Sequence, residues 1–348
     1  MRGVVFDSVG AVRVDELPEP SIEDPRDAIV DVGLSAVCGS DLHAYHGKLP
    51  MVAGESMGHE AVGVVREVGA SVWQVAVGDR VVLPFGVCCG ACWYCRSGAT
   101  SLCAGWRYLG FGAYGGGLAG TQAERASVPG ADVNLLKIPD DVDDERALFA
   151  GDVATTGHYG AALLEPRPDE VIAVVGAGPV GFCAVQALRA TGVETVLALD
   201  LEESRLALVA EAGAIPVPVG DGVDVSKAVK EHTAGRGADA AIDAVGLVPG
   251  YETALRVSRR GGRVCVLGVY GPDERIEVHM GAYWVRQLRL VFAGVCPVQA
   301  RWGRTMELLR TGAIDPLPLV SHRLPLEEAA AGYELFARRE ATKVLLRP

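Results

Sequence analysis

The spacing of apolar and polar residues changes near residue 150. Before that point, short valine-rich runs alternate with clusters of glycine, proline and aspartate, and Pro18, Pro20 and Pro25 interrupt any long helix. Short apolar runs bounded by turn residues are typical of β-strands. We therefore expect an irregular, mostly antiparallel β domain in this part, with strands at residues 4–6, 28–30, 62–65 and 81–83.

After residue 150, apolar runs of about five residues alternate with segments of helical periodicity. Strands that are apolar along their whole length and separated by helices indicate a parallel sheet covered on both faces. We predict helices at 179–191, 202–212 and 301–310, and a closing helix and strand within 335–346. The six predicted strands of the sheet are 171–175, 195–199, 215–219, 238–242, 263–267 and 289–293.

Length and composition narrow the possible partners. The chain has 348 residues, 49% of them hydrophobic, which suggests two domains with well-buried cores. The net charge is −12 and there is no basic stripe, so we expect no nucleic-acid partner. No stretch of about 20 apolar residues is free of charges or turn formers, so we expect no membrane span. The first residues resemble a strand rather than a signal peptide, which favours a cytoplasmic protein.

Four cysteines form a compact run, Cys89, Cys92, Cys95 and Cys103. Four thiolates at this spacing can surround one Zn²⁺ tetrahedrally, and such a closed site has a structural role because no position stays open for substrate. The alternative is a set of disulfides, which a chain of this size without an export signal does not need. Cys88 is a spare thiol beside the run.

A glycine fingerprint, Gly176-x-Gly178-Pro179-Val180-Gly181, lies between a predicted strand and a predicted helix. Gly176 allows a tight turn, Gly178 lets a pyrophosphate approach the backbone, and Gly181 lets the helix pack on the strand. The helix N-terminus would then bind the diphosphate of a dinucleotide. An ordinary turn is the alternative, but the flanking elements favour a Rossmann-type, doubly wound sheet.

Asp200 ends the second strand of this region, about 20 residues after the turn, where a carboxylate can accept both adenosine ribose hydroxyls. It would repel a 2′-phosphate, so we expect NAD rather than NADP. The alternative role for Asp200 is a helix N-cap. Arg205, one turn later, would stack on adenine or contact a phosphate; a solvated helix residue is the equal alternative.

Cys38, His59 and Asp152 form a second candidate metal set. A thiolate, an imidazole and a carboxylate suit Zn²⁺ with a fourth position left for water or substrate, as catalysis requires. Taken singly, each has an ordinary explanation: a small core cysteine, a hydrogen-bonded histidine, a helix N-cap. The hypothesis depends on their occurrence together beside a dinucleotide fold.

These residues also carry a family resemblance. The pattern Gly58-His59-Glu60-x-x-Gly63-x5-Gly69-x-x-Val72, and the segment Cys38-x-Ser40-Asp41-x-His43, resemble the signatures of the zinc-containing alcohol dehydrogenases, in the medium-chain dehydrogenase/reductase superfamily. The resemblance extends over the whole chain. It is closest to the branch of formaldehyde dehydrogenase-like, secondary-alcohol and polyol dehydrogenases, where an Asp such as Asp152 often replaces the third cysteine ligand.

The resemblance implies a divided catalytic domain with a chaperonin-10-like β fold, formed by residues 1–150 and 297–348. The structural-zinc lobe would lie at about 86–105, and residues 151–296 would form the NAD-binding Rossmann domain. The family also implies two zinc ions per subunit and a homodimer or homotetramer.

The resemblance further implies the roles of four residues around the catalytic zinc, which would lower the pKa of the bound alcohol while hydride passes to nicotinamide. Ser40 would accept the proton and His43 would pass it outward. Asp41 would fix the tautomer of His59, and Glu60 would visit the metal during ligand exchange. The alternatives are a capping serine, a surface histidine and a partly buried salt bridge of Glu60. Lys343 matches a family position near the pyrophosphate, with a surface lysine as the near-equal alternative.

We therefore predict a zinc-dependent oxidoreductase that transfers hydride between an alcohol or polyol, or the corresponding carbonyl compound, and NAD(H). One alternative is a formaldehyde dehydrogenase or aldehyde dismutase with tightly held NAD. A second is a non-catalytic NAD-binding protein, which the intact set of Cys38, His59 and Asp152 disfavours.

Overall fold

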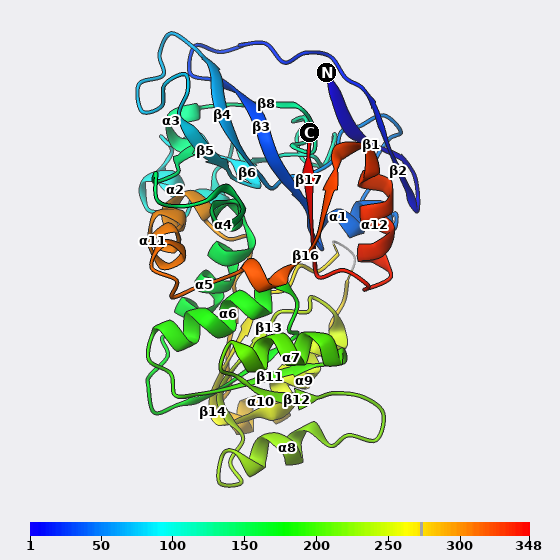
Figure 1. The fold of residues 1–348 in the computed structure, drawn as a ribbon. Helices are drawn as coiled ribbons and strands as arrows, with labels where there is room; N and C mark the ends of the chain where they lie inside the picture. The colour runs from blue at the N-terminus through cyan, green and yellow to red at the C-terminus, as the bar shows by residue number, and fades with distance from the viewer. Residues whose placement is uncertain (272–273) are drawn as a thin grey trace. The chain divides into compact units, whose positions relative to one another are not determined.

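The computed structural model describes residues 1–271 and 274–348 (Figure 1). These residues form two compact units. Unit 1 consists of Met1–Thr155, Pro297–Arg310 and Leu317–Pro348, and unit 2 of Thr156–Cys296 and Thr311–Pro316. Each unit is described separately below.

Unit 1 is built around a sheet of seven strands in the order β16-β17-β3-β4-β5-β9, with β8 also paired to β3. All of its pairs are antiparallel except β16 with β17. Two small antiparallel pairs, β1 with β2 and β6 with β7, complete the β structure. The strands are β1 (Arg2–Ser8), β2 (Ala11–Glu16), β3 (Ala28–Val37), β4 (Ala61–Val68), β5 (Arg80–Leu83), β6 (Gly86–Val87), β7 (Arg107–Tyr108), β8 (Arg125–Val128), β9 (Leu136–Lys137), β16 (Val320–Pro325) and β17 (Lys343–Arg347).

The helices of unit 1 lie mostly in the connections between strands, and most of them are short. α5 contains the boundary between the two units. Their bounds are α1 (Asp41–Tyr45), α2 (Trp93–Arg96), α3 (Ala131–Asn134), α4 (Asp144–Leu148), α5 (Val153–Leu163), α11 (Val298–Arg310) and α12 (Ala329–Ala337), with single 3₁₀ turns at Thr100–Leu102, Phe149–Gly151, Leu317–Leu319 and Leu326–Glu328.

One apolar cluster of unit 1 joins the first and the last segments of the chain. Val4 and Phe6 of β1 pack with Tyr333 and Phe336 of α12 and with Val344 of β17. Figure 1 shows α12, drawn in red, beside β1 and β2. The C-terminal segment is therefore part of the core of unit 1, and not an appendage.

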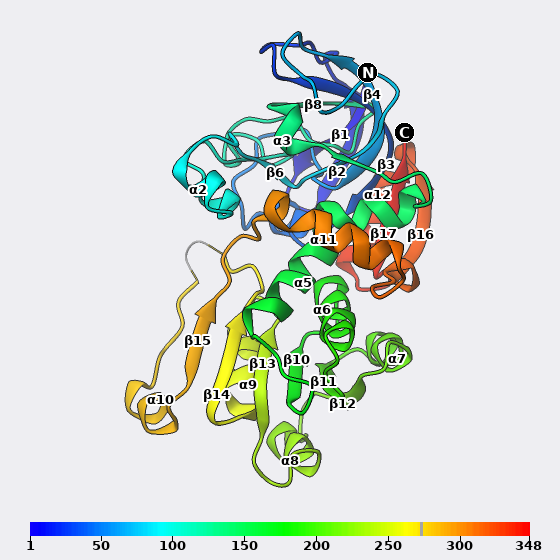
Figure 2. The same ribbon diagram turned by 90° about the vertical axis from the view of Figure 1, so that its left-hand side faces the viewer.

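Unit 2 contains a six-stranded parallel sheet in the order β12-β11-β10-β13-β14-β15, visible side by side in Figure 2. Together with the largely antiparallel sheet of unit 1, this confirms the predicted fold class. The elements are β10 (Val171–Val175), α6 (Pro179–Ala190), β11 (Thr195–Asp200), α7 (Glu203–Glu211), β12 (Ile215–Pro218), α8 (Val225–Glu231), β13 (Ala238–Asp243), α9 (Val248–Val257), β14 (Ser258–Val266), α10 (Met280–Arg286) and β15 (Arg289–Phe292).

The inner strands β10, β11 and β13 of this sheet are largely buried on both faces, as their apolar sequences predict, whereas the edge strands β12 and β15 are partly exposed. Ala173 and Val175 of β10 lie in one apolar cluster with Val229 of α8 and Tyr251 of α9. Successive side chains of a strand point to opposite faces, so Ile172 and the other alternate residues face the other side. They are equally buried.

The strand order changes direction at β10. β11 and β12 follow on one side of it, and β13 to β15 follow on the other. In open parallel sheets, ligands bind at the carboxyl ends of the strands at such a switch point. The loop after β10, which carries the glycine fingerprint, lies at this point.

Two sequence predictions near the C-terminus need correction. We predicted that the closing helix starts no earlier than residue 335, but α12 begins at Ala329. The alanine run 329–331 favours helix through side chains that cost no rotamer entropy, and the predicted start missed it. β16 was not predicted, because its exposed and partly buried residues lack the apolar run of a buried strand. Within the described residues, the helices are too short or too polar to cross a bilayer.

Candidate metal centres and dinucleotide-binding turn

Cys38, His59 and Asp152 come together in unit 1, and Glu60 joins them. One ligand atom from each of the four side chains lies within 4.8 Å of all the others. His59 Nε2 is 3.4 Å from Asp152 Oδ2, and Cys38 Sγ is 3.6 Å from the same oxygen. The three residues of the predicted catalytic set therefore face one common point.

The pairing of three strands places these ligand atoms. β3 ends next to Cys38 and β4 begins just after His59; the two strands are antiparallel, with Ser35 opposite Ala61, so both residues lie at the same end of the sheet. Asp152 follows the turn Phe149–Gly151. A Cβ on Gly151 would lie 2.4 Å from the carbonyl oxygen of Leu83, so only glycine lets this turn reach the end of β5.

Ser40 lies at the edge of the same cluster. Its Oγ is 3.0 Å from His59 Nε2 and 3.4 Å from Cys38 Sγ. Ser40 stands at the N-cap position of α1, but its side chain makes no capping hydrogen bond. The alternative of a purely capping serine is therefore wrong.

Asp41 is fully buried behind His59. Its Oδ1 lies 2.9 Å from His59 Nδ1, and its Oδ2 accepts a hydrogen bond of 2.9 Å from the backbone N–H of Cys38. A carboxylate at Nδ1 favours the proton on that nitrogen and leaves Nε2 free to bind a cation. Nε2 is the atom that faces Cys38, Ser40 and Asp152.

Glu60 and Lys343 form a buried ion pair at the rear of the cluster. Lys343 Nζ donates to Glu60 Oε1 over 2.6 Å, and neither side chain has exposed surface. The surface-lysine alternative for Lys343 is therefore wrong. The salt-bridge alternative for Glu60 holds, except that the bridge is fully rather than partly buried.

The donor set fits a zinc ion. Sulfur, imidazole nitrogen and carboxylate oxygen are zinc ligands, and three protein ligands with one remaining position are typical of catalytic sites. Burial and the charges of Glu60 and Asp152 raise the pKa of Cys38 to about 11. Burial lowers the pKa of His59, but the charge of Asp41 and hydrogen bonds to Asp152, Asp41 and Cys38 outweigh it, so the pKa lies well above its usual value. A divalent cation would relieve the repulsion and displace both protons.

The four cysteines of the run form the second group whose ligand atoms lie within 4.8 Å of one another. Cys92 Sγ is 3.5 Å from Cys95 Sγ, and Cys89 Sγ is 4.0 Å from it. These separations are far longer than the roughly 2.05 Å of a disulfide bond and suit thiolates around one ion. Backbone N–H groups of Ala91 and Cys92 lower the pKa of Cys89 to about 6, which favours the thiolate form that binds metal, whereas burial raises the pKa of Cys95.

The base of this lobe is held by Asn134. Its side chain accepts from the N–H of Cys88 and donates to the carbonyl oxygen of the same residue, at 3.1 and 2.9 Å. Gln299 of α11 donates to Asn134 Oδ1 and to the carbonyl oxygen of Gly86. Cys88 therefore anchors the lobe through its backbone.

The glycine fingerprint of unit 2 adopts a tight strand-to-helix turn. Gly176 has φ +91°, and a Cβ on Gly181 would lie 1.8 Å from the carbonyl oxygen of Gly176. Gly178 is the N-cap of α6, with Pro179 in the first turn of the helix and Val180 next to it. The first N–H groups of α6 therefore lack helical partners at the carboxyl end of β10, where an anion can accept from them.

Asp200 lies beside this turn. Its Oδ2 accepts from the N–H of Ala177 over 2.6 Å, and its Oδ1 accepts from the N–H of Glu202 over 2.9 Å. Glu202 is the N-cap of α7, so the N-cap alternative for Asp200 is wrong. Arg205 Nη1 lies 3.9 Å from Asp200 Oδ2, with the side chain 26% exposed. Arg205 is thus partly exposed and close to Asp200, which leaves both the adenine-stacking role and the solvated-residue alternative open.

Two residues near the site were not predicted from the sequence, and the side chain of one predicted residue, His43, has no hydrogen bond to the cluster within the described part of the chain. Gln122 and Tyr333 connect to Asp41 through buried hydrogen bonds, and neither belongs to a local motif. His43 lies on α1, where burial and the neighbouring Lys48 lower its pKa. Among the hydrogen bonds of the described residues, none joins the side chains of His43 and Ser40.

Two family models match the chain in separate parts. Residues 24–140 match the "Alcohol dehydrogenase GroES-like domain" model, and residues 179–311 match the "Zinc-binding dehydrogenase" model. The first range covers the segments of Cys38, His59 and the four cysteines, and the second begins inside the glycine fingerprint.

Individual proteins match over the whole chain. A protein of Mycobacterium tuberculosis, named a probable zinc-binding alcohol dehydrogenase, is 37% identical over 100% of this chain and 89% of its own. The structure of the alcohol dehydrogenase TADH from Thermus sp. ATN1 is 40% identical, with a TM-score of 0.94 over 100% of this chain and 99% of that one. A structure from Sinorhizobium meliloti 1021, named a "putative zinc-binding dehydrogenase" and bound to NADP, is 28% identical, with a TM-score of 0.86 over 100% of this chain and 99% of that one.

Proposed function

Because the chain belongs to the zinc-containing alcohol dehydrogenases of the medium-chain dehydrogenase/reductase superfamily, we propose that it oxidises an alcohol or polyol with NAD and catalyses the reverse reduction with NADH. The observation that carries this proposal is the convergence of Cys38, His59 and Asp152 on one point beside Ser40. Two zinc ions per subunit belong to the proposal, one at this point and one among the four cysteines.

Zinc bound by Cys38, His59 and Asp152 would supply a Lewis acid that lowers the pKa of the substrate hydroxyl. The protein side chains then have separate tasks. Asp41 orients the His59 ring, and Ser40 Oγ accepts the hydroxyl proton, since it lies within 3.4 Å of both Cys38 and His59. His43, in the middle of α1, would release this proton to solvent through a bridging group, since no side-chain hydrogen bond of the described residues joins it directly to Ser40. Glu60, paired with Lys343, adds a carboxylate within reach of the same metal.

The coenzyme proposal rests on the turn of unit 2. The unpaired N–H groups at the start of α6 would bind the pyrophosphate, with Gly176, Gly178 and Gly181 keeping the backbone accessible and Pro179 and Val180 forming the first turn. Asp200 would accept from the adenosine ribose and repel a 2′-phosphate, so we propose NAD. Arg205 would stack on the adenine, close to Asp200.

We also propose a homodimer or homotetramer. β15 is the last strand in the order of the described sheet, so one of its edges carries unpaired backbone groups. Near it, four large apolar side chains are 62–80% exposed, those of Met280, Trp284, Val285 and Phe292. An apolar strand edge of this kind suits a second copy of the chain. The mass measured by light scattering should be two or four times the 36.4 kDa of one chain. Trp284→Lys should lower this mass towards that of a single chain. A monomeric wild type would contradict this part of the proposal.

A spectrophotometric screen tests the activity. Primary alcohols, secondary alcohols and polyols are offered with NAD or NADP, before and after removal of metal by a chelator. We expect reduction of NAD by at least one class, loss of activity on chelation and recovery with Zn²⁺. Absence of coenzyme reduction by the zinc-loaded protein with all classes, or activity that survives removal of both ions, would contradict the proposal.

The same assay separates the alternatives. An aldehyde dismutase converts aldehyde without added coenzyme, and a non-catalytic NAD-binding protein binds NAD without reducing it. No described feature of the chain favours either. Cys38→Ser should abolish turnover but retain NAD binding, whereas Cys265→Ser, at a buried cysteine of β14 outside both clusters, should retain both.

A further inference from the structure

A buried chain of polar contacts runs from helix α12 to the candidate metal ligand His59: two hydrogen bonds link Tyr333 to Asp41, and a close ion-pair contact links Asp41 to His59. Tyr333 Oη donates to Gln122 Oε1 over 2.9 Å, and Gln122 Nε2 lies 3.4 Å from Asp41 Oδ2. Asp41 Oδ1 in turn lies 2.9 Å from His59 Nδ1. Tyr333, Gln122 and Asp41 are 0% exposed and His59 is 2% exposed. Bulk water therefore does not compete for any of these contacts.

Both atoms of the Gln122 amide group are hydrogen-bonded: Nε2 donates to two acceptors and Oε1 accepts from Tyr333. Besides Asp41, its Nε2 donates to the carbonyl oxygen of Ala36 over 2.9 Å. With the amide reversed, Oε1 would face two acceptors, a carbonyl oxygen and a carboxylate. The hydroxyl of Tyr333 stabilises the observed orientation, because it donates to Oε1 from the opposite side.

The carboxylate of Asp41 is fixed from one side only. Oδ2 accepts from Gln122 and from the backbone N–H of Cys38, and Oδ1 is left towards His59. A carboxylate held in this way selects the imidazole tautomer with the proton on Nδ1. Nε2 then keeps its lone pair towards Cys38, Ser40 and Asp152.

The backbone beside His59 is shaped to admit Gln122. Gly58 has φ +90°, and a Cβ at this residue would lie 2.3 Å from Gln122 Cγ. Gln122 thus passes directly over the residue that precedes His59. This contact explains why the Gly58-His59-Glu60 motif has glycine at position 58: a side chain there would collide with Gln122.

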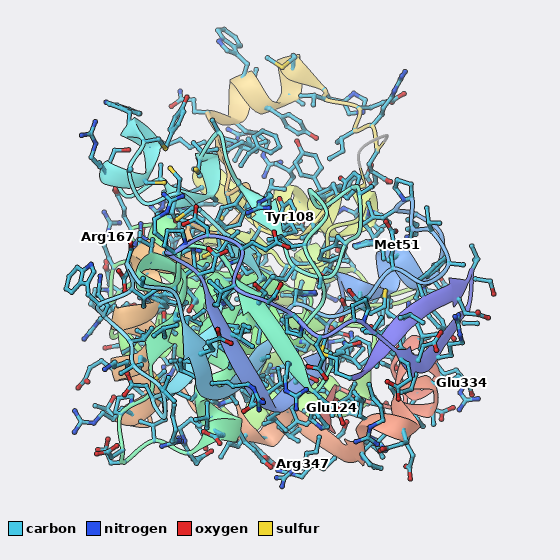
Figure 3. All side chains as sticks on the ribbon, turned by 90° about the horizontal axis from the view of Figure 1, so that it is seen from above. Met51, Tyr108, Glu124, Arg167, Glu334 and Arg347 are labelled. Carbon is cyan, nitrogen blue, oxygen red and sulfur yellow. The ribbon has the colours of Figure 1, made fainter. Side chains whose placement is uncertain are left out.

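We propose that Gln122 and Tyr333 are positioning residues for the metal at Cys38, His59 and Asp152, acting through Asp41 on the tautomer and orientation of His59. Neither touches the metal-facing atoms. The inference rests on the proposed function only in that it needs a zinc ion at this cluster. The C-terminal helix α12 thereby contributes to metal affinity from behind the site. Glu334, the next residue on this helix, is exposed and extends outwards in Figure 3, whereas Tyr333 is fully buried.

The test compares three variants of the full chain. Tyr333→Phe removes only the hydroxyl, and Gln122→Met removes the amide at similar volume. Tyr45→Phe is the matched control, because the Tyr45 ring lies 5.5 Å from that of Tyr333 in the same apolar cluster but has no hydrogen bond to Gln122. The four-cysteine site serves as an internal reference in each variant.

Two readouts are independent of activity: zinc retained against graded chelator, and the ligand-field spectrum after replacement of the catalytic zinc by Co²⁺. Gln122→Met should weaken zinc binding at the site of Cys38, His59 and Asp152 by about 10- to 100-fold, and leave the four-cysteine site unchanged. This is the range for groups that orient a metal-binding histidine. Tyr333→Phe should weaken the same site by about 5-fold, as expected for one lost hydrogen bond. Both should shift the Co²⁺ bands, and Tyr45→Phe should change neither readout.

The possible outcomes separate this inference from the proposed function. A wild type that holds no ion at Cys38, His59 and Asp152 overturns both. A wild type that holds two ions, with variants that hold them equally tightly and show unchanged Co²⁺ bands, overturns the inference alone. Equal weakening of both zinc sites would show general destabilisation and would also overturn it. Should Gln122→Met fail to fold, Tyr333→Phe, which loses one oxygen atom, decides the matter.

Discussion

Lys343 and Glu60 form an ion pair with an N–O distance of 2.6 Å and no exposed surface on either side chain. The two residues are 283 positions apart in the chain. Glu60 follows the candidate ligand His59, and Lys343 begins β17, so the pair fastens the last strand of unit 1 to the metal cluster. A buried charge whose partner is removed is costly, because its desolvation is no longer compensated.

Lys343→Met should therefore lower the free energy of unfolding of the zinc-loaded protein by about 3–5 kcal/mol. Urea denaturation measures this loss. The control is Lys137→Met: Lys137 Nζ lies 2.6 Å from Asp79, but its side chain is 52% exposed. Removing this exposed pair should cost at most about 1 kcal/mol.

The double variant Glu60→Gln/Lys343→Met should be more stable than the sum of the two single losses predicts, by about 0.5–3 kcal/mol of coupling. Strictly additive losses would show that the two charges do not stabilise each other, and this interpretation of the pair would fail.

The two metal sites should be separable by mutation. Wild-type protein should contain two Zn²⁺ per chain by elemental analysis. Cys38→Ser and Cys95→Ser should each contain one, because each removes a ligand from a different cluster. The Cys95 variant should also show the larger loss in thermal stability, since a structural zinc site contributes directly to folding. One zinc in the wild type, or two in either variant, would contradict the assignment.

Asp200→Ala should weaken NAD binding and raise the relative affinity for NADP, because the variant lacks the carboxylate that we propose to repel a 2′-phosphate. The structure adds a second consequence: Asp200 accepts from Ala177 inside the glycine turn, so the variant should also lose about 1–3 kcal/mol of stability through an unsatisfied buried N–H. Isothermal calorimetry measures the affinities for NAD and NADP, and urea denaturation measures the loss of stability. Asp221→Ala, at an exposed position of the same unit, should show neither. A wild type that already prefers NADP would refute the role of Asp200.

Glu170 should make unit 2 sensitive to acid. Burial raises its pKa, but the hydrogen bond and charge of Arg263, 2.5 Å away, together with Arg167, outweigh this and hold the pKa below its usual value of 4.5. A carboxyl whose pKa is depressed by folding stabilises the protein above the unfolded pKa, and this contribution disappears as the pH falls through the folded pKa.

We therefore expect Glu170→Gln to be less stable than wild type at neutral pH, by about 1–3 kcal/mol. The difference should shrink below pH 4.5 and vanish once wild-type Glu170 is protonated. Thermal melts from pH 7 to pH 3 measure it. Asp169→Asn, at a side chain with 82% exposure, should run parallel to wild type throughout. A Glu170→Gln deficit that persists unchanged at low pH would assign the loss to packing instead of charge.

The elements that proved predictable share a local signal. The six parallel strands and α6 follow from uninterrupted apolar runs and from the glycines of the turn. The four cysteines likewise lie within 15 residues of one another, from 89 to 103. In each case the residues that define the element or site are close together in the sequence, so that apolar periodicity or ligand spacing is enough to predict it.

The residues that escaped prediction depend on long-range contacts. Tyr333 contacts Gln122 across 211 positions, and Lys343 meets Glu60 across 283. Neither a tyrosine in a short helix nor a lysine at the start of a strand carries a pattern that specifies such a partner. Lysine is almost never buried unless it is paired, so the burial of Lys343 could be expected only once its partner Glu60 was known, and the sequence does not reveal that partner.

The composition of unit 1 also has a consequence for biosynthesis. A ribosome exposes Cys38, His59 and Asp152 early, and domains generally fold as units as they emerge. Unit 2, whose last residue is Pro316, can acquire its structure while translation continues. Tyr333 and Lys343 follow only later. The nascent protein can thus meet zinc before its C-terminal support exists, and firm retention of the catalytic ion should be a late step in maturation.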